Sequence, residues 1–267
     1  MPQPFKLTAK HHAEFDSVGV LRLPGFLPPT DAAAMADAIW ADLSTRHGYD
    51  RAQPETWSLE RPMHFQNVVR SGAFARLERL GVPELAAAFL GDDAVHASKR
   101  WGQPLVTFPA GGWDVPHATW HLDLLATASL DVLPAIRVFA FVDAVAARGG
   151  GTPYIAGSHR VVVDRARQAG RSKPLRSSDM RAALKAEEPW LAALMSPGGG
   201  DRVTRFMRVW GAMRGFPVRV EEMTGEPGDI IVMHPAMFHT VAPNGLERPR
   251  MMLVETFFRK GVLGHLT

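Results

Sequence analysis

The chain has 267 residues, of which 46% are hydrophobic and 21% charged, the proportions of a globular protein with a sizeable core. Its 30 lysines and arginines nearly balance 27 aspartates and glutamates, and no basic run points to a nucleic-acid partner. The absence of cysteine excludes disulfides, thiolate metal sites and cysteine nucleophiles.

The sequence shows no segment that predicts contact with a membrane. The first residues are not followed by an apolar signal-peptide core. The most apolar stretch, 133–147, is interrupted by Arg137 and Asp143 and is too short to span a bilayer. We therefore expect a cytoplasmic protein whose residues 1–267 form a single domain.

The N-terminal third predicts one strand and several helices. An apolar run at 18–23, closed by Pro24-Gly25, is typical of a strand and a turn. A helix is expected from the capping residue Thr30 to Gly48, and two shorter ones over 71–80 and 83–90. The long helix has an apolar stripe at helical spacing: Met35, Ala36, Ile39, Trp40 and Leu43.

From about residue 94, short apolar runs separated by glycine and proline turns predict antiparallel strands. The expected strands are 105–108, the segment around His121, 135–142, 218–220, 230–232 and 251–254. The pattern breaks at 162–215, where a helical insertion is expected, either a lid over a site or a flap covering the sheet. Its apolar face comprises Met180, Leu184, Leu191 and Leu194. We expect a mainly β jelly roll with flanking helices.

His121 and Asp123 are the first candidates for chemistry. Alternate side chains of a strand share one face, so this imidazole and carboxylate are expected to point the same way. They supply two of the three ligands of a 2-His-1-carboxylate site, which leaves one face of Fe(II) open. We take His239 as the third ligand. His234, just before Pro235, is expected to orient a turn or support a ligand instead.

Arg250 weighs against the simplest alternative, in which these three polar residues only satisfy local hydrogen bonds. It precedes the apolar run 251–254, and an arginine facing inward there needs a buried anionic partner. A planar guanidinium forms a bidentate pair with a carboxylate, which a lysine cannot reproduce.

The combined pattern resembles the phytanoyl-CoA dioxygenase family of Fe(II)/2-oxoglutarate oxygenases, over residues 15–258. Residues 148–159 also parallel the family's G…PGSH segment, with Ala156 in place of the usual proline. The other shared positions are His121, Asp123, Gly228, Asp229, His234, Pro235, His239, Asn244 and Arg250.

This resemblance implies a double-stranded β-helix of the cupin type. It implies that His121, Asp123 and His239 bind Fe(II) and that Arg250 binds the far carboxylate of 2-oxoglutarate. With O2, such an enzyme hydroxylates a C–H bond of a small-molecule substrate and releases succinate and CO2. The family often has a hydroxyl residue two positions after the distal histidine, where this chain has Val241. The candidate substitutes are Thr107, Arg137 and Thr152.

Two other classes of function stay open. A cupin-like metal-dependent hydrolase or isomerase uses the same three ligands without needing Arg250, and a jelly-roll binding protein needs no catalysis. A nucleotide site at Gly149–Gly151 is rejected, because no Lys-Ser/Thr pair follows the glycines. Ser158-His159 is expected to be a structural turn rather than a nucleophile and base. Substrate identity and oligomeric state are left open.

Overall fold

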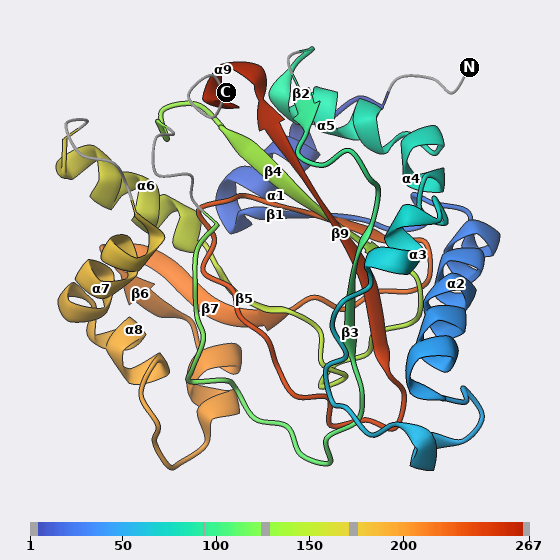
Figure 1. Cartoon of the computed structure of the whole chain (residues 1–267). Helices are drawn as coiled ribbons and strands as arrows, with labels where there is room; N and C mark the ends of the chain where they lie inside the picture. Colours follow the sequence, from blue (N-terminus) through green and yellow to red (C-terminus); the bar gives the residue numbers. More distant parts are fainter. Residues whose placement is uncertain (1–4, 93, 124–128, 171–175, 264–267) are drawn as a thin grey trace.

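Two antiparallel sheets with flanking helices form the protein in a computed structural model that describes residues 5–92, 94–123, 129–170 and 176–263 (Figure 1). The large sheet has the order β1 (Val20–Leu23), β8 (Ile230–Met233), β4 (Ala135–Phe141), β9 (Arg250–Arg259) and β2 (Ala94–His96), and β3 (Gln103–Thr107) also pairs with β9. The small sheet has the order β5 (Pro153–Ala156), β7 (Phe216–Glu222) and β6 (Gly211–Met213).

The helices fall into two groups, one on each sheet (Figure 1). On the large sheet these are α1 (Ala9–Val18), α2 (Pro29–His47), α3 (Gln66–Arg70), α4 (Arg76–Arg79) and α5 (Val82–Leu90). Beside the small sheet these are α6 (Ser158–Gln168), α7 (Ser177–Glu187) and α8 (Pro189–Leu194). The remaining elements are a 3-10 turn η1 (Pro54–Thr56), a π-helical turn η2 (Thr204–Arg208) and α9 (Lys260–Leu263).

Strand alternation gives the large sheet two different apolar faces. On β4, Ile136 and Val138 pack against the helices, whereas Phe139 and Phe141 lie in the core between the sheets. Both faces are covered, so these strands are apolar almost throughout. By the same alternation Arg137 of β4 is on the face of Phe139, and Arg250 of β9 is on the face of Met252. The fold therefore directs both arginines into the space between the sheets.

The structure corrects three local expectations. Residues 71–75 form turns between α3 and α4, so one helix over 71–80 is wrong. The helix expected to carry Met180 through Leu194 is two helices, α7 and α8, divided at Glu188, with Pro189 beginning α8. All four predicted apolar residues are nevertheless buried. The segment around His121 is not a regular strand, and His121 forms an isolated bridge to His239.

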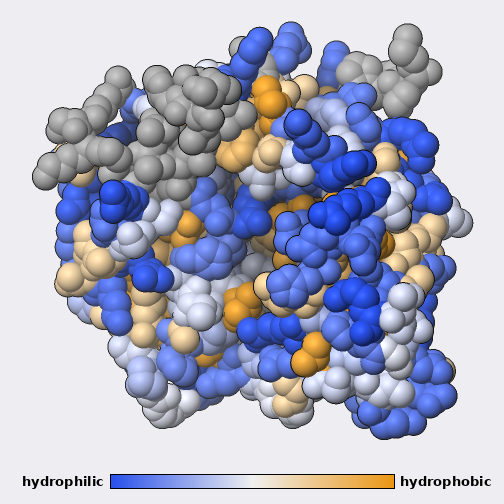
Figure 2. Space-filling model, in the orientation of Figure 1, coloured by the Kyte–Doolittle hydropathy of each residue, from blue (hydrophilic) through white to orange (hydrophobic). Residues whose placement is uncertain are grey.

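The insertion has a core of its own against the small sheet. Its predicted apolar residues pack with Val218 and Val220 of β7 and with Trp120 and Leu122, which flank His121. The face of the molecule in Figure 2 is mostly hydrophilic, with small separate apolar areas. Among the described helices, none is long and apolar enough to cross a membrane.

Gly151 shows why small residues recur in the 149–151 run. A Cβ at this position would lie 2.1 Å from the carbonyl oxygen of Met223, because the two chain segments pass each other closely there. The run thus has a packing role, in agreement with the rejection of a nucleotide site.

Candidate metal centre

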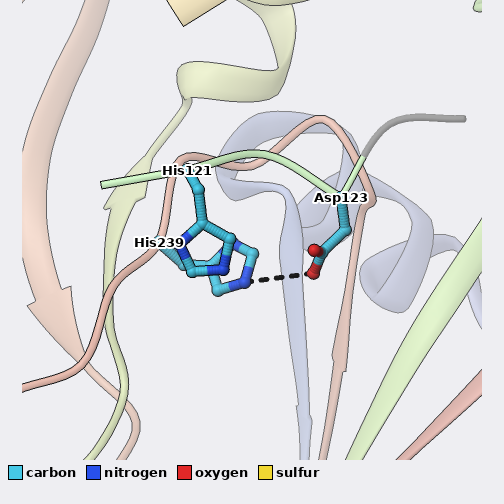
Figure 3. A group of neighbouring side chains, drawn as sticks. All are labelled: His121, Asp123 and His239. Carbon is cyan, nitrogen blue, oxygen red and sulfur yellow. Dashed lines mark ion pairs between the residues drawn. The ribbon is translucent and has the colours of Figure 1, made fainter. Parts of the chain in front are cut away.

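His121 and His239 are paired through their own backbones. The His121 amide donates to the His239 carbonyl at 3.0 Å, and the His239 amide donates to the His121 carbonyl at 3.1 Å. Their rings consequently lie on the same side, with centroids 4.2 Å apart. Asp123 joins them from the same segment, and its amide donates to the Pro235 carbonyl. Figure 3 shows the carboxylate directed toward the two rings.

Both histidines have the same tautomer, set by the backbone two residues earlier. His121 Nδ1 lies 2.9 Å from the Thr119 carbonyl, and His239 Nδ1 lies 3.0 Å from the Met237 carbonyl. A carbonyl oxygen only accepts, so each Nδ1 carries the proton and each Nε2 keeps its lone pair for a ligand. This is how metal-binding histidines are held in proteins.

The three side chains offer ligand atoms that all lie within 4.8 Å of one another, a group that could hold a metal ion. His239 Nε2 is 3.1 Å from Asp123 Oδ2, so with Nδ1 protonated a lone pair faces a carboxylate oxygen. A cation between these atoms, or a second proton on the ring, removes that repulsion. The donor set therefore fits a divalent metal ion with nitrogen and oxygen ligands.

Electrostatics keeps Asp123 ionised and His121 neutral. Burial works to raise the pKa of Asp123, but His239, in the state where its ring carries a second proton, and the charge of Arg137 hold it well below its usual range. Burial lowers the pKa of His121, and the neighbouring His239 lowers it further. Both residues are thus in the protonation states in which they bind metal near neutral pH.

Arg137 lies at this cluster, not beside Arg250. Its Nη1 contacts Asp123 Oδ2 and is 3.4 Å from His239 Nε2. Its Nε is buried and has no hydrogen-bond partner among the residues that the structure describes. The guanidinium therefore fixes the carboxylate and keeps a donor free beside the cluster.

Arg250 and Thr107 form a second polar pair on the same face of the large sheet. They are directly opposed in the register of β3 and β9, and Arg250 Nη2 donates to Thr107 Oγ1 at 3.0 Å. Arg250 is only 3% exposed, its Nε has no partner, and it forms no ion pair with the described residues. Burial, together with the nearby Arg61, lowers the pKa of Arg250 to about 10. A buried guanidinium in this state fits an anionic ligand.

The remaining residues singled out in the sequence have other contacts. Thr152 is buried, and its carbonyl accepts from the Met223 amide. Val241 is 37% exposed. His234 Nδ1 accepts from the Ala236 amide at 3.0 Å, which confirms that it orients the turn. Ser158 likewise has a structural contact, its hydroxyl accepting from the Phe238 amide.

Sequence reasoning missed the part played by Thr119. This residue has φ of 61°, an unusual conformation for a β-branched side chain, and it directs its carbonyl toward His121 Nδ1. Nothing in the sequence marks a threonine as left-handed. The sequence could have pointed to Thr119 only through its position, two residues before the candidate ligand His121.

The comparisons with known proteins rest on structure alone, because no family model and no curated protein matches the sequence. SnoK, a non-heme α-ketoglutarate-dependent carbocyclase from nogalamycin biosynthesis, has a TM-score of 0.58 at 16% identity over 99% of this chain and 92% of that chain. HygX from Streptomyces hygroscopicus, with nickel and 2-oxoglutarate bound, has a TM-score of 0.55 at 15% identity over 94% and 87%.

A third similar structure is the epimerase SnoN in complex with Fe3+, α-ketoglutarate and nogalamycin RO. Its TM-score is 0.52 at 15% identity, over 93% of this chain and 82% of that chain. At such identities the likeness shows the fold. The expected jelly roll with flanking helices is thereby confirmed.

Proposed function

We propose that the protein is a non-haem Fe(II)- and 2-oxoglutarate-dependent oxygenase that hydroxylates a C–H bond of a small molecule. The observation that carries the proposal is the pairing of two features in one fold. One is a His-Asp-His group whose histidines direct Nδ1 to backbone carbonyls and Nε2 to the cluster, and the other is a buried arginine without an acidic partner among the described residues. The first fits a metal ion, and the second fits a carboxylate.

In this proposal His121, Asp123 and His239 hold the metal, and Arg250 binds the far carboxylate of 2-oxoglutarate. Thr107 takes the part of the hydroxyl missing at Val241, because it already contacts Arg250. Three similar structures support the assignment, since SnoK is α-ketoglutarate-dependent and HygX and SnoN have 2-oxoglutarate, also called α-ketoglutarate, bound. The chemistry that Fe(II) and 2-oxoglutarate supply together when bound is O2-dependent C–H oxidation with release of succinate and CO2.

Arg137 has a different proposed role from the one that the sequence suggested. Its contact with Asp123 orients that carboxylate, and its free Nε is available to an anion bound at the metal end of the site. We assign it to the carboxylate of 2-oxoglutarate nearer the metal. Thr152 stays a candidate contact without a described link to Arg250.

The test is anaerobic addition of Fe(II) and 2-oxoglutarate, with detection of the weak visible metal-to-ligand band of their chelate. Wild type is expected to give the band, and His239→Ala and Arg250→Ala are expected to weaken it. Arg248→Ala is the matched control, because Arg248 is exposed and pairs with Asp143 at the surface. A folded, metal-loaded protein without the band would contradict the proposal.

The result also discriminates between this function and a cupin-like hydrolase or isomerase. That alternative needs the three metal ligands but has no use for a buried guanidinium that binds a carboxylate. Two results together would favour the hydrolase or isomerase. Metal binding would depend on His239, and the Arg250→Ala variant would bind every ligand with the affinity of wild type.

A further inference from the structure

A pocket of about 310 Å³ lies between the segment that leads to His121 and helix α7 of the insertion. We call it the basic pocket. Its principal lining residues are His117, Thr119, Trp120, Arg181, Lys185 and Met195. None of the lining residues is acidic.

Within the part of the chain that the structure describes, Arg181 and Lys185 of the basic pocket lack the carboxylate partners that Arg165 and Arg214 have. Arg181 and Lys185 are one turn apart on α7, and neither forms an ion pair with any described residue. In the same region Arg165 pairs with Glu187 at 2.9 Å and Arg214 pairs with Asp164 at 2.7 Å. Carboxylates of the insertion thus neutralise Arg165 and Arg214, whereas Arg181 and Lys185 face a hollow.

Arg181 is held in place by a contact that uses only part of its hydrogen-bonding capacity. Its Nη1 donates to the carbonyl of Trp120 at 3.1 Å. A guanidinium has five N–H donors, so the rest of the fork stays available to an anion. Trp120 is fixed in turn, since its indole N–H donates to the Pro116 carbonyl at 2.9 Å. The cation therefore sits on a rigid part of the chain.

The basic pocket is lined by the residues that directly precede His121 in the chain. Thr119, which lines it, accepts the hydrogen bond of His121 Nδ1, and Trp120 is the residue before His121. His121 itself is partly exposed. An anion bound between α7 and this segment therefore lies against the residues that directly precede His121.

We propose that the basic pocket binds an anionic group, a carboxylate or a phosphate, of the substrate. The substrate is then a small organic acid whose charge is neutralised by Arg181 and Lys185. That the bound molecule is a substrate rests on the function proposed above. That the pocket binds an anion rests only on the pocket and its charges.

The test uses the fluorescent sulfonate 8-anilinonaphthalene-1-sulfonate and its uncharged parent N-phenyl-1-naphthylamine, with no metal or 2-oxoglutarate added. The double variant Arg181→Gln/Lys185→Gln is expected to bind the sulfonate about tenfold more weakly and the uncharged compound as wild type does, because two exposed cations each contribute modestly. The control Arg79→Gln/Arg208→Gln removes the same charge at two other exposed positions and is expected to bind both compounds unchanged.

The source of the anionic group is resolved by displacement of the bound sulfonate. Benzoate and phenyl phosphate present the same ring with different anions, so the more effective competitor identifies a carboxylate or a phosphate. Any of three results would overturn the proposal. Wild type would bind the charged and uncharged fluorophores with equal affinity, or the control variant would lose as much affinity for the sulfonate as the double variant does. The third is that neither benzoate nor phenyl phosphate displaces the sulfonate. Because no metal is present, this outcome is independent of whether the oxygenase proposal succeeds.

Discussion

The hydroxyl groups of Thr119 and Thr240 lie 2.7 Å apart and join the two segments that carry His121 and His239. Thr240 Oγ1 also donates to the Ala118 carbonyl at 3.1 Å. This clasp holds Thr119 in its left-handed conformation, from which its carbonyl reaches His121 Nδ1. The geometry of one candidate ligand thus depends on a hydroxyl next to the other.

Thr240→Val keeps the shape of the side chain and removes the clasp. We expect a loss of about 1–2 kcal/mol in unfolding free energy and an affinity for Co(II) about tenfold weaker, because His121 loses its support. Urea unfolding and calorimetric titration measure the two effects. Thr45→Val, which removes an exposed hydroxyl bonded to the Ala41 carbonyl in α2, serves as the control. Unchanged Co(II) affinity would limit the clasp to a structural role.

Arg250→Met is expected to separate stability from ligand binding. Removing a buried charge without an acidic partner should raise the unfolding free energy of the ligand-free protein by about 1–2 kcal/mol. The same change should abolish calorimetric binding of 2-oxoglutarate to the Ni(II)-loaded protein. Arg248→Met, at an exposed arginine two residues earlier, should alter neither quantity. A variant that loses stability together with binding would show that Arg250 is held by contacts within the chain.

Arg137→Gln should change the affinities for metal and 2-oxoglutarate in opposite directions. The guanidinium contacts Asp123 and lies near His239, so its positive charge opposes a metal ion at the cluster. We therefore expect tighter Ni(II) binding and weaker binding of 2-oxoglutarate to the Ni(II)-loaded protein, both measured by titration. If both affinities fall together, the principal role of Arg137 is to orient Asp123.

Arg202 links the insertion to the segment before the candidate metal ligands His121 and Asp123. It is buried, and its guanidinium donates to the carbonyls of Val115, Pro116, Leu194 and Ser196. Arg202→Met should lower the unfolding free energy by about 2–4 kcal/mol, because buried carbonyls lose their donors. It should also weaken sulfonate binding, since these carbonyls flank two lining residues of the basic pocket. Arg208→Met, at an exposed position nearby, should do neither.

Two buried histidines should make the fold sensitive to acid. Burial lowers the pKa of His159 to about 4, and burial with His159 nearby lowers that of His234 to about 3, from an ordinary 6.5. The unfolded chain therefore takes up these protons first. Their contribution is fully present above about pH 6.5 and is lost as pH falls toward 4, on the order of 2–3 kcal/mol for His159.

The double variant His159→Gln/His234→Asn tests this by urea unfolding at pH 7 and pH 4.5. Gln can replace the donor that His159 Nε2 directs to the Asp16 carbonyl, and Asn can replace the acceptor that His234 offers to Ala236. We expect the variant to lose less stability between the two pH values than wild type or His12→Asn, a change at an exposed histidine. An equal loss in all three would assign the acid sensitivity to other groups.

Spacing and punctuation in the sequence predicted a jelly roll with flanking helices and placed His121 and Asp123 on one side, and the resemblance to a family added His239, which the structure brings within reach of the other two. These patterns did not predict that His121 lies on an isolated bridge, since a strand and a single bridged residue have the same local pattern. Arg137 was a candidate substitute for the hydroxyl missing at Val241, which placed it at the same carboxylate as Arg250. Register separates them: on β9, Arg250 faces Thr107 of β3, and Arg137 of β4 faces Thr256. Strand register depends on which distant segments pair with each other, and a single sequence does not reveal that pairing.

The basic pocket was missed for a similar reason. The pattern of Arg181 and Lys185 on a helix is that of a solvated face, and only the packing of α7 against the Trp120 segment turns it into one side of a hollow. The same charges elsewhere on the insertion are neutralised by Glu187 and Asp164. Whether a lysine or arginine forms an ion pair is decided by tertiary packing, which brings distant carboxylates near it.

The bridge between His121 and His239 also makes any bound metal a cross-link between two stretches of chain that are remote in sequence. Such a cross-link exists only in the folded protein, so free metal concentration becomes a determinant of how long the molecule survives heating. At a hundredfold excess over its dissociation constant a metal ion adds about 2.7 kcal/mol. Chelators would then shorten the lifetime of the protein, and metal scarcity would act on its abundance.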